Sequence, residues 1–109
     1  MLKLIKNPEF KATIDINVPG SAKAEKIDLT FNYMTKSEYA DFSKQHEADK
    51  IDDILPLIVK GWSGVCDENG KAIEYSEEAL KMLLDVVPSA AVDIYRGFNS
   101  ELFGARIKN

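Results

Sequence analysis

The sequence is poor in the side chains that hold metals or perform covalent catalysis. Its 109 residues include one cysteine, Cys66, and one histidine, His46. A structural zinc site usually takes four cysteine or histidine ligands, and an internal disulfide takes two cysteines. The acidic residues near position 50 lack the spacing of a calcium loop. We therefore expect no metal, no cofactor and no internal disulfide.

An excess of positive charge is also missing. Fourteen lysines and arginines stand against 18 acidic residues, which gives a formal net charge of −4. A nucleic-acid-binding domain needs a basic face for its phosphate contacts, so we expect no nucleic-acid partner.

Long apolar runs are absent too. The longest, residues 54–59, is far short of the roughly 20 residues that span a bilayer. The first six residues alternate lysine with apolar side chains, and Pro8 and Glu9 follow, unlike the continuous apolar run of a signal peptide. We expect a soluble cytoplasmic protein with no membrane partner.

No group of residues in the sequence forms a catalytic motif. His46 falls on the apolar stripe of a predicted helix, and Cys66 lies beside a predicted turn, so both are interpreted as structural. Residues 61–64 contain two glycines but have neither the spacing nor the lysine of a phosphate-binding loop. Acidic residues are numerous, and nothing singles out two of them for acid–base chemistry. The sequence predicts no catalytic residues and no enzyme.

Two segments near the start alternate strictly between apolar and polar residues. Phe10, Ala12, Ile14, Ile16 and Val18 share one face of residues 10–18, and residues 26–33 repeat the pattern. Because side chains alternate across a strand, each segment is typical of a half-buried strand. A Pro-Gly turn after Val18 separates them, which predicts an antiparallel hairpin.

The remainder of the chain has helical periodicity. Thr35 and Glu38 form a capping-box pattern for a first helix. An apolar stripe predicts a second helix, and Gly61 is expected to mark where it stops. The stripe comprises Ile51, Ile54, Leu55, Ile58, Val59 and Trp62.

An Asp-Glu-Asn-Gly turn at 67–70 then predicts a short hairpin. Ser76 caps a third helix, and Pro88 is expected as the first residue of a fourth. The apolar face of that last helix comprises Ala91, Ile94, Tyr95, Phe98, Leu102 and Ala105.

These elements predict an α+β fold in which helices are grouped behind a small sheet. The length favours a single domain over residues 1–109, with a β-hairpin part at 1–35 and a helical part at 36–109.

Four apolar residues are candidates for binding a protein partner: Ile51, Trp62, Val92 and Phe103. Trp62 is either a core anchor or an interface hot spot, since tryptophan is enriched at both. Val92 and Phe103 share a flank of the last helix, three turns apart. They either close against the sheet or form a docking groove for a partner helix.

Several segments together resemble the tail assembly chaperones of long-tailed bacteriophages. They are residues 4–10, 57–65, 67–70, 75–80 and 101–106. The resemblance extends over essentially the whole chain, and its most specific part is the Trp62 segment followed by two amphipathic helices.

The resemblance implies a non-enzymatic chaperone of the host bacterial cytoplasm. Such proteins bind the long, helical, apolar tape measure protein before the tail tube polymerises, and they are not found in the mature virion. Contact with the tail tube protein and a homo-oligomer are left open. The alternative is a structural tube or connector subunit that stays in the virion and uses its first strands to extend a neighbour's sheet.

Overall fold

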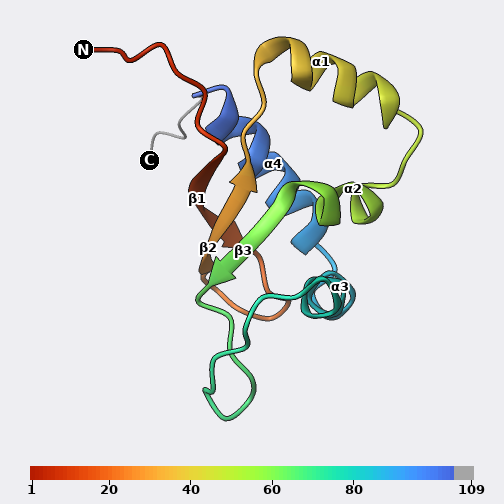
Figure 1. The fold of residues 1–109 in the computed structure, drawn as a ribbon. Coiled ribbons are helices and arrows are strands. Elements are labelled where there is room, and N and C mark those ends of the chain that lie inside the picture. Colours follow the sequence, from red (N-terminus) through yellow and green to blue (C-terminus); the bar gives the residue numbers. More distant parts are fainter. Residues whose placement is uncertain (105–109) are drawn as a thin grey trace.

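A three-stranded antiparallel sheet forms the centre of the molecule, and helices cover one of its faces (Figure 1). The computed structural model describes residues 1–104. The strands β1 (Glu9–Ile16), β2 (Glu25–Asn32) and β3 (Val59–Ser63) lie in the order β1-β2-β3. The helices are α1 (Lys36–Gln45), α2 (Ile51–Ile58), α3 (Glu77–Val86) and α4 (Ala90–Leu102). The predicted α+β fold is confirmed.

The predicted N-terminal hairpin is confirmed in detail. β1 pairs with β2 over the full length of both strands, from Glu9 opposite Asn32 to Ile16 opposite Glu25. The apolar set faces the helices and is buried; it comprises Ala12, Ile14, Ile16, Ile27, Leu29 and Phe31. The intervening residues of β1 are exposed, as the period of two requires.

Two helix starts follow the predicted capping chemistry. The hydroxyl of Thr35 accepts from the backbone N–H of Glu38, and the Glu38 carboxylate accepts from the N–H of Thr35. Ser76 likewise accepts from the N–H of Ala79 at the start of α3. Each side chain satisfies a donor that the first helical turn leaves free.

The predicted helix from Ile51 to Trp62 is wrong in its second half. Helix α2 ends at Ile58, and the chain turns at once into β3, with extended dihedrals at Val59 (φ −87°, ψ 128°). The strand pairs Val59 with Phe31 and Trp62 with Leu29, so backbone pairing on β2 prevails over helical periodicity. Gly61 is therefore a strand residue opposite Thr30 and does not end the helix.

The start of the last helix also differs from the prediction. α4 begins at Ala90 with Ser89 as its cap residue, so Pro88 lies two residues before the helix and is not its first residue. Ala91, Ile94 and Phe98 are buried as predicted. Ala105, which was predicted on the same face, lies outside the described residues.

Helix α4 packs against the inner face of the hairpin. Phe31 and Phe98 are fully buried and meet edge to face with their ring centroids 5.1 Å apart, and Phe10 lies within 6 Å of both rings. At Gly97 the helix approaches Ile14 so closely that a β-carbon would overlap the end of its side chain. The small residue therefore sets the depth at which α4 lies against β1.

A buried carboxylate ties the start of α4 to the end of β1. Asp93 is 8% exposed and accepts from the backbone N–H of Asn17 at 3.0 Å and from the hydroxyl of Ser89 at 2.9 Å. The amide group of Asn17 donates to the same carboxylate. These contacts fix where the helix crosses the strand.

We predict that Asp93→Ala lowers the free energy of unfolding by about 1–3 kcal/mol, because Asn17 and Ser89 lose the charged, buried acceptor of their partly buried hydrogen bonds. Urea denaturation measures the change, with the exposed Asp85→Ala on α3 as the control, which is expected to shift stability by less than about 0.5 kcal/mol. Equal effects of the two substitutions would contradict this role of Asp93.

Candidate protein-binding surfaces

Trp62 occupies the outer strand of the sheet and holds the following segment in place. Its indole N–H donates to the carbonyl of Ile73 at 2.8 Å, and its ring meets Tyr75 edge to face at 5.2 Å. The hydroxyl of Tyr75 donates to the carbonyl of Val59, and burial, followed by the charge of Glu77, raises the pKa of this phenol. Together these contacts fix both ends of residues 64–75 against β3.

Residues 64–75 form the predicted short hairpin. Cys66 pairs with Ala72 in an isolated bridge, and the N–H of Ile73 donates to the carbonyl of Val65. The Asp67 carboxylate accepts from the N–H groups of Asn69 and Lys71, which closes the tip. This hairpin is a distinct feature beside α3 in Figure 1.

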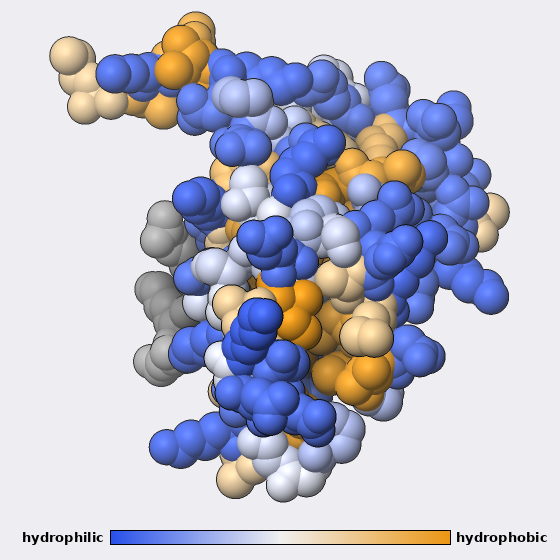
Figure 2. All heavy atoms as spheres, turned by 60° about the horizontal axis from the view of Figure 1, so that its bottom comes forward, coloured by the Kyte–Doolittle hydropathy of each residue, from blue (hydrophilic) through white to orange (hydrophobic). Residues whose placement is uncertain are grey.

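An apolar depression of about 240 Å³ lies between this hairpin and α3. We call it the Trp62 groove; it is lined by Trp62, Val65, Cys66, Ile73, Ala79, Met82, Leu83, Val86 and Val87. Met82 and Val86 are 63% and 68% exposed. Apolar side chains gather on the face that Figure 2 presents, beside the hydrophilic residues of the hairpin. The groove offers uncovered apolar surface of the kind that marks protein interfaces.

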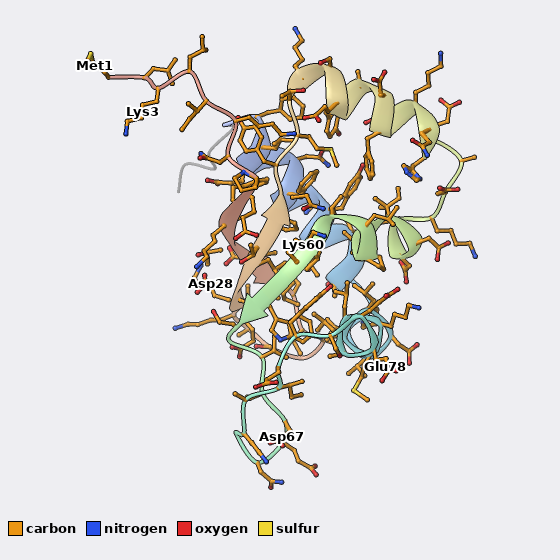
Figure 3. All side chains as sticks on the ribbon, viewed as in Figure 1. Met1, Lys3, Asp28, Lys60, Asp67 and Glu78 are labelled. Atoms are coloured by element: carbon orange, nitrogen blue, oxygen red, sulfur yellow. The ribbon has the colours of Figure 1, made fainter. Side chains whose placement is uncertain are left out.

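The segment that forms the hairpin and α3 carries an excess of acidic residues. Residues 64–88 contain six acidic residues and two lysines, a net charge of 2 − 6 = −4, so the remaining residues carry 12 charges of each sign. Asp67 lies on the hairpin and Glu78 on α3, on either side of the groove (Figure 3). The segment that supplies the hairpin and α3 walls of the groove therefore carries the net negative charge of the chain.

A second depression, of about 670 Å³, lies where the N-terminal segment meets the end of α4. We call it the Phe103 groove; it is lined by Leu4, Ile5, Lys6, Tyr33, Met34, Thr35, Lys36, Leu102 and Phe103. Phe103 is 55% exposed and meets Tyr39 of α1 edge to face at 4.8 Å. In Figure 1 this region lies at the opposite end of the molecule from α3 and the 64–75 hairpin.

The four predicted partner-binding residues therefore do not form one surface. Trp62 and Phe103 line different grooves, and Trp62 is partly buried at the base of its own. Val92 is 46% exposed on α4, whereas Ile51 is partly buried against the core at the start of α2. The sequence prediction did not include Met82 and Val86, because their spacing of four residues places them on one face of α3 without showing whether that face is exposed.

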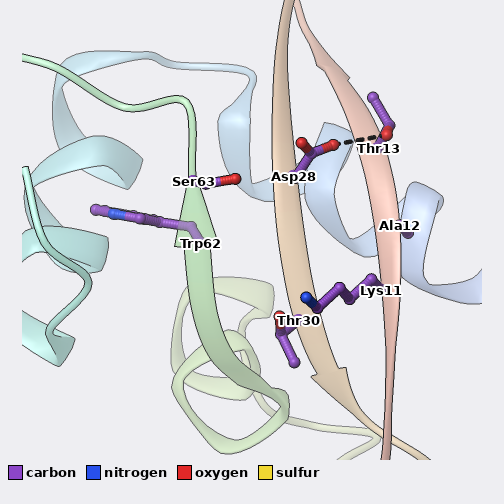
Figure 4. Close-up of a pocket in the computed structure, with 7 residues that line it drawn as sticks. All are labelled: Lys11, Ala12, Thr13, Asp28, Thr30, Trp62 and Ser63. Carbon is purple, nitrogen blue, oxygen red and sulfur yellow. Dashed lines mark hydrogen bonds between the residues drawn. The ribbon is translucent and has the colours of Figure 1, made fainter. Parts of the chain in front are cut away.

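The outer face of the sheet is polar. A shallow depression of about 330 Å³ lies there, lined by Lys11, Ala12, Thr13, Asp28, Thr30, Trp62 and Ser63 (Figure 4). The hydroxyl of Thr13 donates to the carboxylate of Asp28 at 2.7 Å, so these two polar groups satisfy each other. Five of the seven lining residues are polar or charged, whereas the lining of the Trp62 groove is mainly apolar.

The single histidine and the single cysteine differ in their surroundings: His46 is in structural contacts, whereas Cys66 lines the Trp62 groove. The ring of His46 packs against Phe42 at a tilted angle, and its Nδ1 lies 2.7 Å from Asp49. Cys66 is exposed on the hairpin. Within residues 1–104, no three histidine, cysteine or acidic side chains come together as a metal site would require. None of the described helices is long and apolar enough to cross a membrane.

A salt bridge anchors the N-terminal segment at the rim of the Phe103 groove. Lys6 lies 2.8 Å from the Glu38 carboxylate. Its hydrogen bond, together with the backbone N–H of Thr35, lowers the pKa of Glu38 from 4.5 to about 2. Because the folded-state pKa is depressed, the stabilisation is present above the unfolded pKa and is lost as the pH falls from 4.5 towards 2.

We predict that Lys6→Gln raises the pKa of Glu38, because the carboxylate loses its hydrogen bond to the Lys6 ammonium. The pKa stays below its ordinary value, because the backbone N–H of Thr35 still donates to the carboxylate. Carbon-detected NMR titration of the Glu38 carboxyl group measures the change. Lys3→Gln, on the same segment, is the control and is expected to leave the titration as it is. An unaltered Glu38 pKa in Lys6→Gln would show that Lys6 does not engage this carboxylate.

Comparison with known proteins gives one family. The model of the phage tail assembly chaperone family matches residues 1–109, the entire sequence. Searches of curated proteins and of solved structures gave no match. The family match agrees with the resemblance seen in the sequence and with exposed apolar grooves on a small α+β domain. The chain belongs to the phage tail assembly chaperone family.

Proposed function

We propose that this chaperone binds the apolar helical segments of the tape measure protein during assembly of a phage tail. The observation that carries the proposal is the uncovered apolar surface at both ends of the domain, in the Trp62 groove and the Phe103 groove. A long helix with apolar stripes aggregates if its stripes stay bare, and a partner with apolar grooves removes them from water.

The charge of the chain supports the same role. A net charge of −4 keeps a protein with exposed apolar patches in solution until its client arrives. Several copies along one client helix gain affinity through avidity, so each single contact is permitted to be weak and reversible. Weak contacts suit a chaperone that leaves the client when the tube polymerises.

Under this proposal the protein acts in the host bacterial cytoplasm and is not part of the mature virion. Its role is binding, and it catalyses no reaction. Contact with the tail tube protein and self-association are further parts of the proposed assembly role. The family match and the two exposed apolar grooves support this role.

A structural tail subunit is the second candidate, and one observation favours it. β1 is an outer strand of the sheet over eight residues, so it offers an edge to which another chain's strand could add. Mass spectrometry of purified particles separates the two candidates. We expect the protein to be missing from finished virions, and its presence in tube stoichiometry would support the structural role instead.

We predict that Val92→Ser/Phe103→Ser weakens the complex formed when the protein is co-expressed with the tape measure protein. Both side chains are about half exposed, so the loss of apolar contact area falls mainly on the bound state. Affinity purification through the chaperone, followed by quantification of the tape measure protein, measures the effect.

Leu57→Ser is the matched control, because Leu57 is 49% exposed, as much as the two tested residues, but lies on α2 and not on α4 or at its end. Circular dichroism and denaturation confirm that each variant folds. A folded Val92/Phe103 variant that retains the client as well as the control does would remove these two residues from the binding surface.

A further inference from the structure

We infer that the Trp62 groove takes a client helix whose apolar stripe is flanked by lysine or arginine. The inference rests on the proposed function, and it specifies which groove is used and which chemical class of segment it prefers. It follows from the groove's shape, its rigid base and the charge of its rim.

The groove is built to receive side chains. A cavity of roughly 150 Å³ lined by aliphatic and aromatic side chains is large enough for a benzene molecule. At about 240 Å³, the Trp62 groove therefore has room for one aromatic or two aliphatic side chains, and not for an entire helix. This matches the recognition mode in which an amphipathic helix inserts anchor residues spaced by three or four positions.

The base of the groove is held in shape before any client binds. Trp62 is fixed by its hydrogen bond to Ile73 and its edge contact with Tyr75, and Tyr75 is fixed by its bond to Val59. On the opposite wall, Leu80 and Leu84 lock α3 to the core. Because both walls are ordered in advance, less conformational entropy is lost when a client binds.

The exposed positions of α3 combine apolar contact with negative charge. At about 100° per residue, Glu78 and Asp85 lie within about 60° of Met82 on one side, and Val86 lies about 40° away on the other. A helix seated on Met82 and Val86 therefore has one flank on the side of Glu78 and Asp85, and Asp85 also lines a depression towards α2 together with Asp52, Asp53 and Lys81. Asp67, Glu68 and Glu74 add three further acids on the hairpin side.

This arrangement discriminates between clients by charge. Lysine or arginine beside the apolar stripe meets carboxylates of opposite sign, whereas glutamate or aspartate at the same positions meets like charge. Exposed charge pairs are screened by salt, so the preference for a basic flank shrinks as ionic strength rises, while the apolar anchoring persists.

The test uses two synthetic amphipathic helices with the same leucine stripe and no tryptophan, one flanked by lysine and the other by glutamate. Trp62 is the one tryptophan of the chain, so its fluorescence reports occupation of the groove directly. We expect the lysine-flanked peptide to bind the intact protein at least about tenfold more tightly at low salt, with the ratio falling at about 1 M salt.

Three variants locate the effect. Met82→Ser/Val86→Ser, at exposed positions, is expected to weaken binding of both peptides. Glu78→Lys/Asp85→Lys is expected to reverse the preference towards the glutamate-flanked peptide. Asp41→Lys/Glu47→Lys changes the net charge by the same amount on the α1 side of the molecule and is expected to keep the original preference.

Equal binding of the two peptides at low salt would overturn the inference, as would a preference that the Asp41/Glu47 control reverses equally well. If the tape measure protein still co-purifies with Met82→Ser/Val86→Ser at the wild-type level, the Trp62 groove is not the client-binding site, although the proposed function stands. If wild-type protein fails to retain the tape measure protein at all, the proposed function itself fails.

Discussion

The contact between α4 and the hairpin is the constraint on which the remaining structure depends. Phe98 packs against both Phe10 and Phe31, Gly97 lets the helix lie close against Ile14, and Asp93 fixes its start to Asn17. Helices α2 and α3 complete the same core through Leu55, Ile58 and Leu80, which are fully buried. Their outward apolar side chains, Leu57, Met82 and Val86 among them, stay in contact with water.

The Trp62 groove is a consequence of that arrangement. Helix α3 commits Leu80 and Leu84 to the core, and its remaining apolar residues turn towards the hairpin. The hairpin is held at the sheet by Trp62 and Tyr75 and does not fold down over Met82 and Val86, which stay more than 60% exposed. The chain belongs to the phage tail assembly chaperone family, and uncovered apolar surface suits the client binding that we propose for it.

The sequence predicted those elements whose signals are local. Strict alternation in residues 10–18 and 26–33, the Thr35 capping box and the Ser76 cap each depend on neighbouring residues, and each was confirmed. β3 was missed because its residues continue a helical period while their partner, β2, lies about 30 positions away. The periodicity of apolar residues within one segment does not report backbone pairing with a strand so far away in the chain.

The candidate surface was predictable only in part, for the same reason. Trp62 was predicted as either a core anchor or an interface residue, and it packs partly buried against the core. Its place at the base of a groove depends on β3 and on the hairpin contact with Ile73. Met82 and Val86 became candidates once exposure was known, because their spacing alone also fits a buried face. The position of the acidic residues at 64–88 relative to the groove likewise depends on the fold.

Hydrogen–deuterium exchange of the chaperone, alone and in complex with the tape measure protein, tests the central claim most directly. The account predicts that complex formation slows exchange in residues 65–73 and in α3, on the two walls of the Trp62 groove. Protection confined to α1, or exchange in both walls that is unchanged in a verified complex, would contradict it.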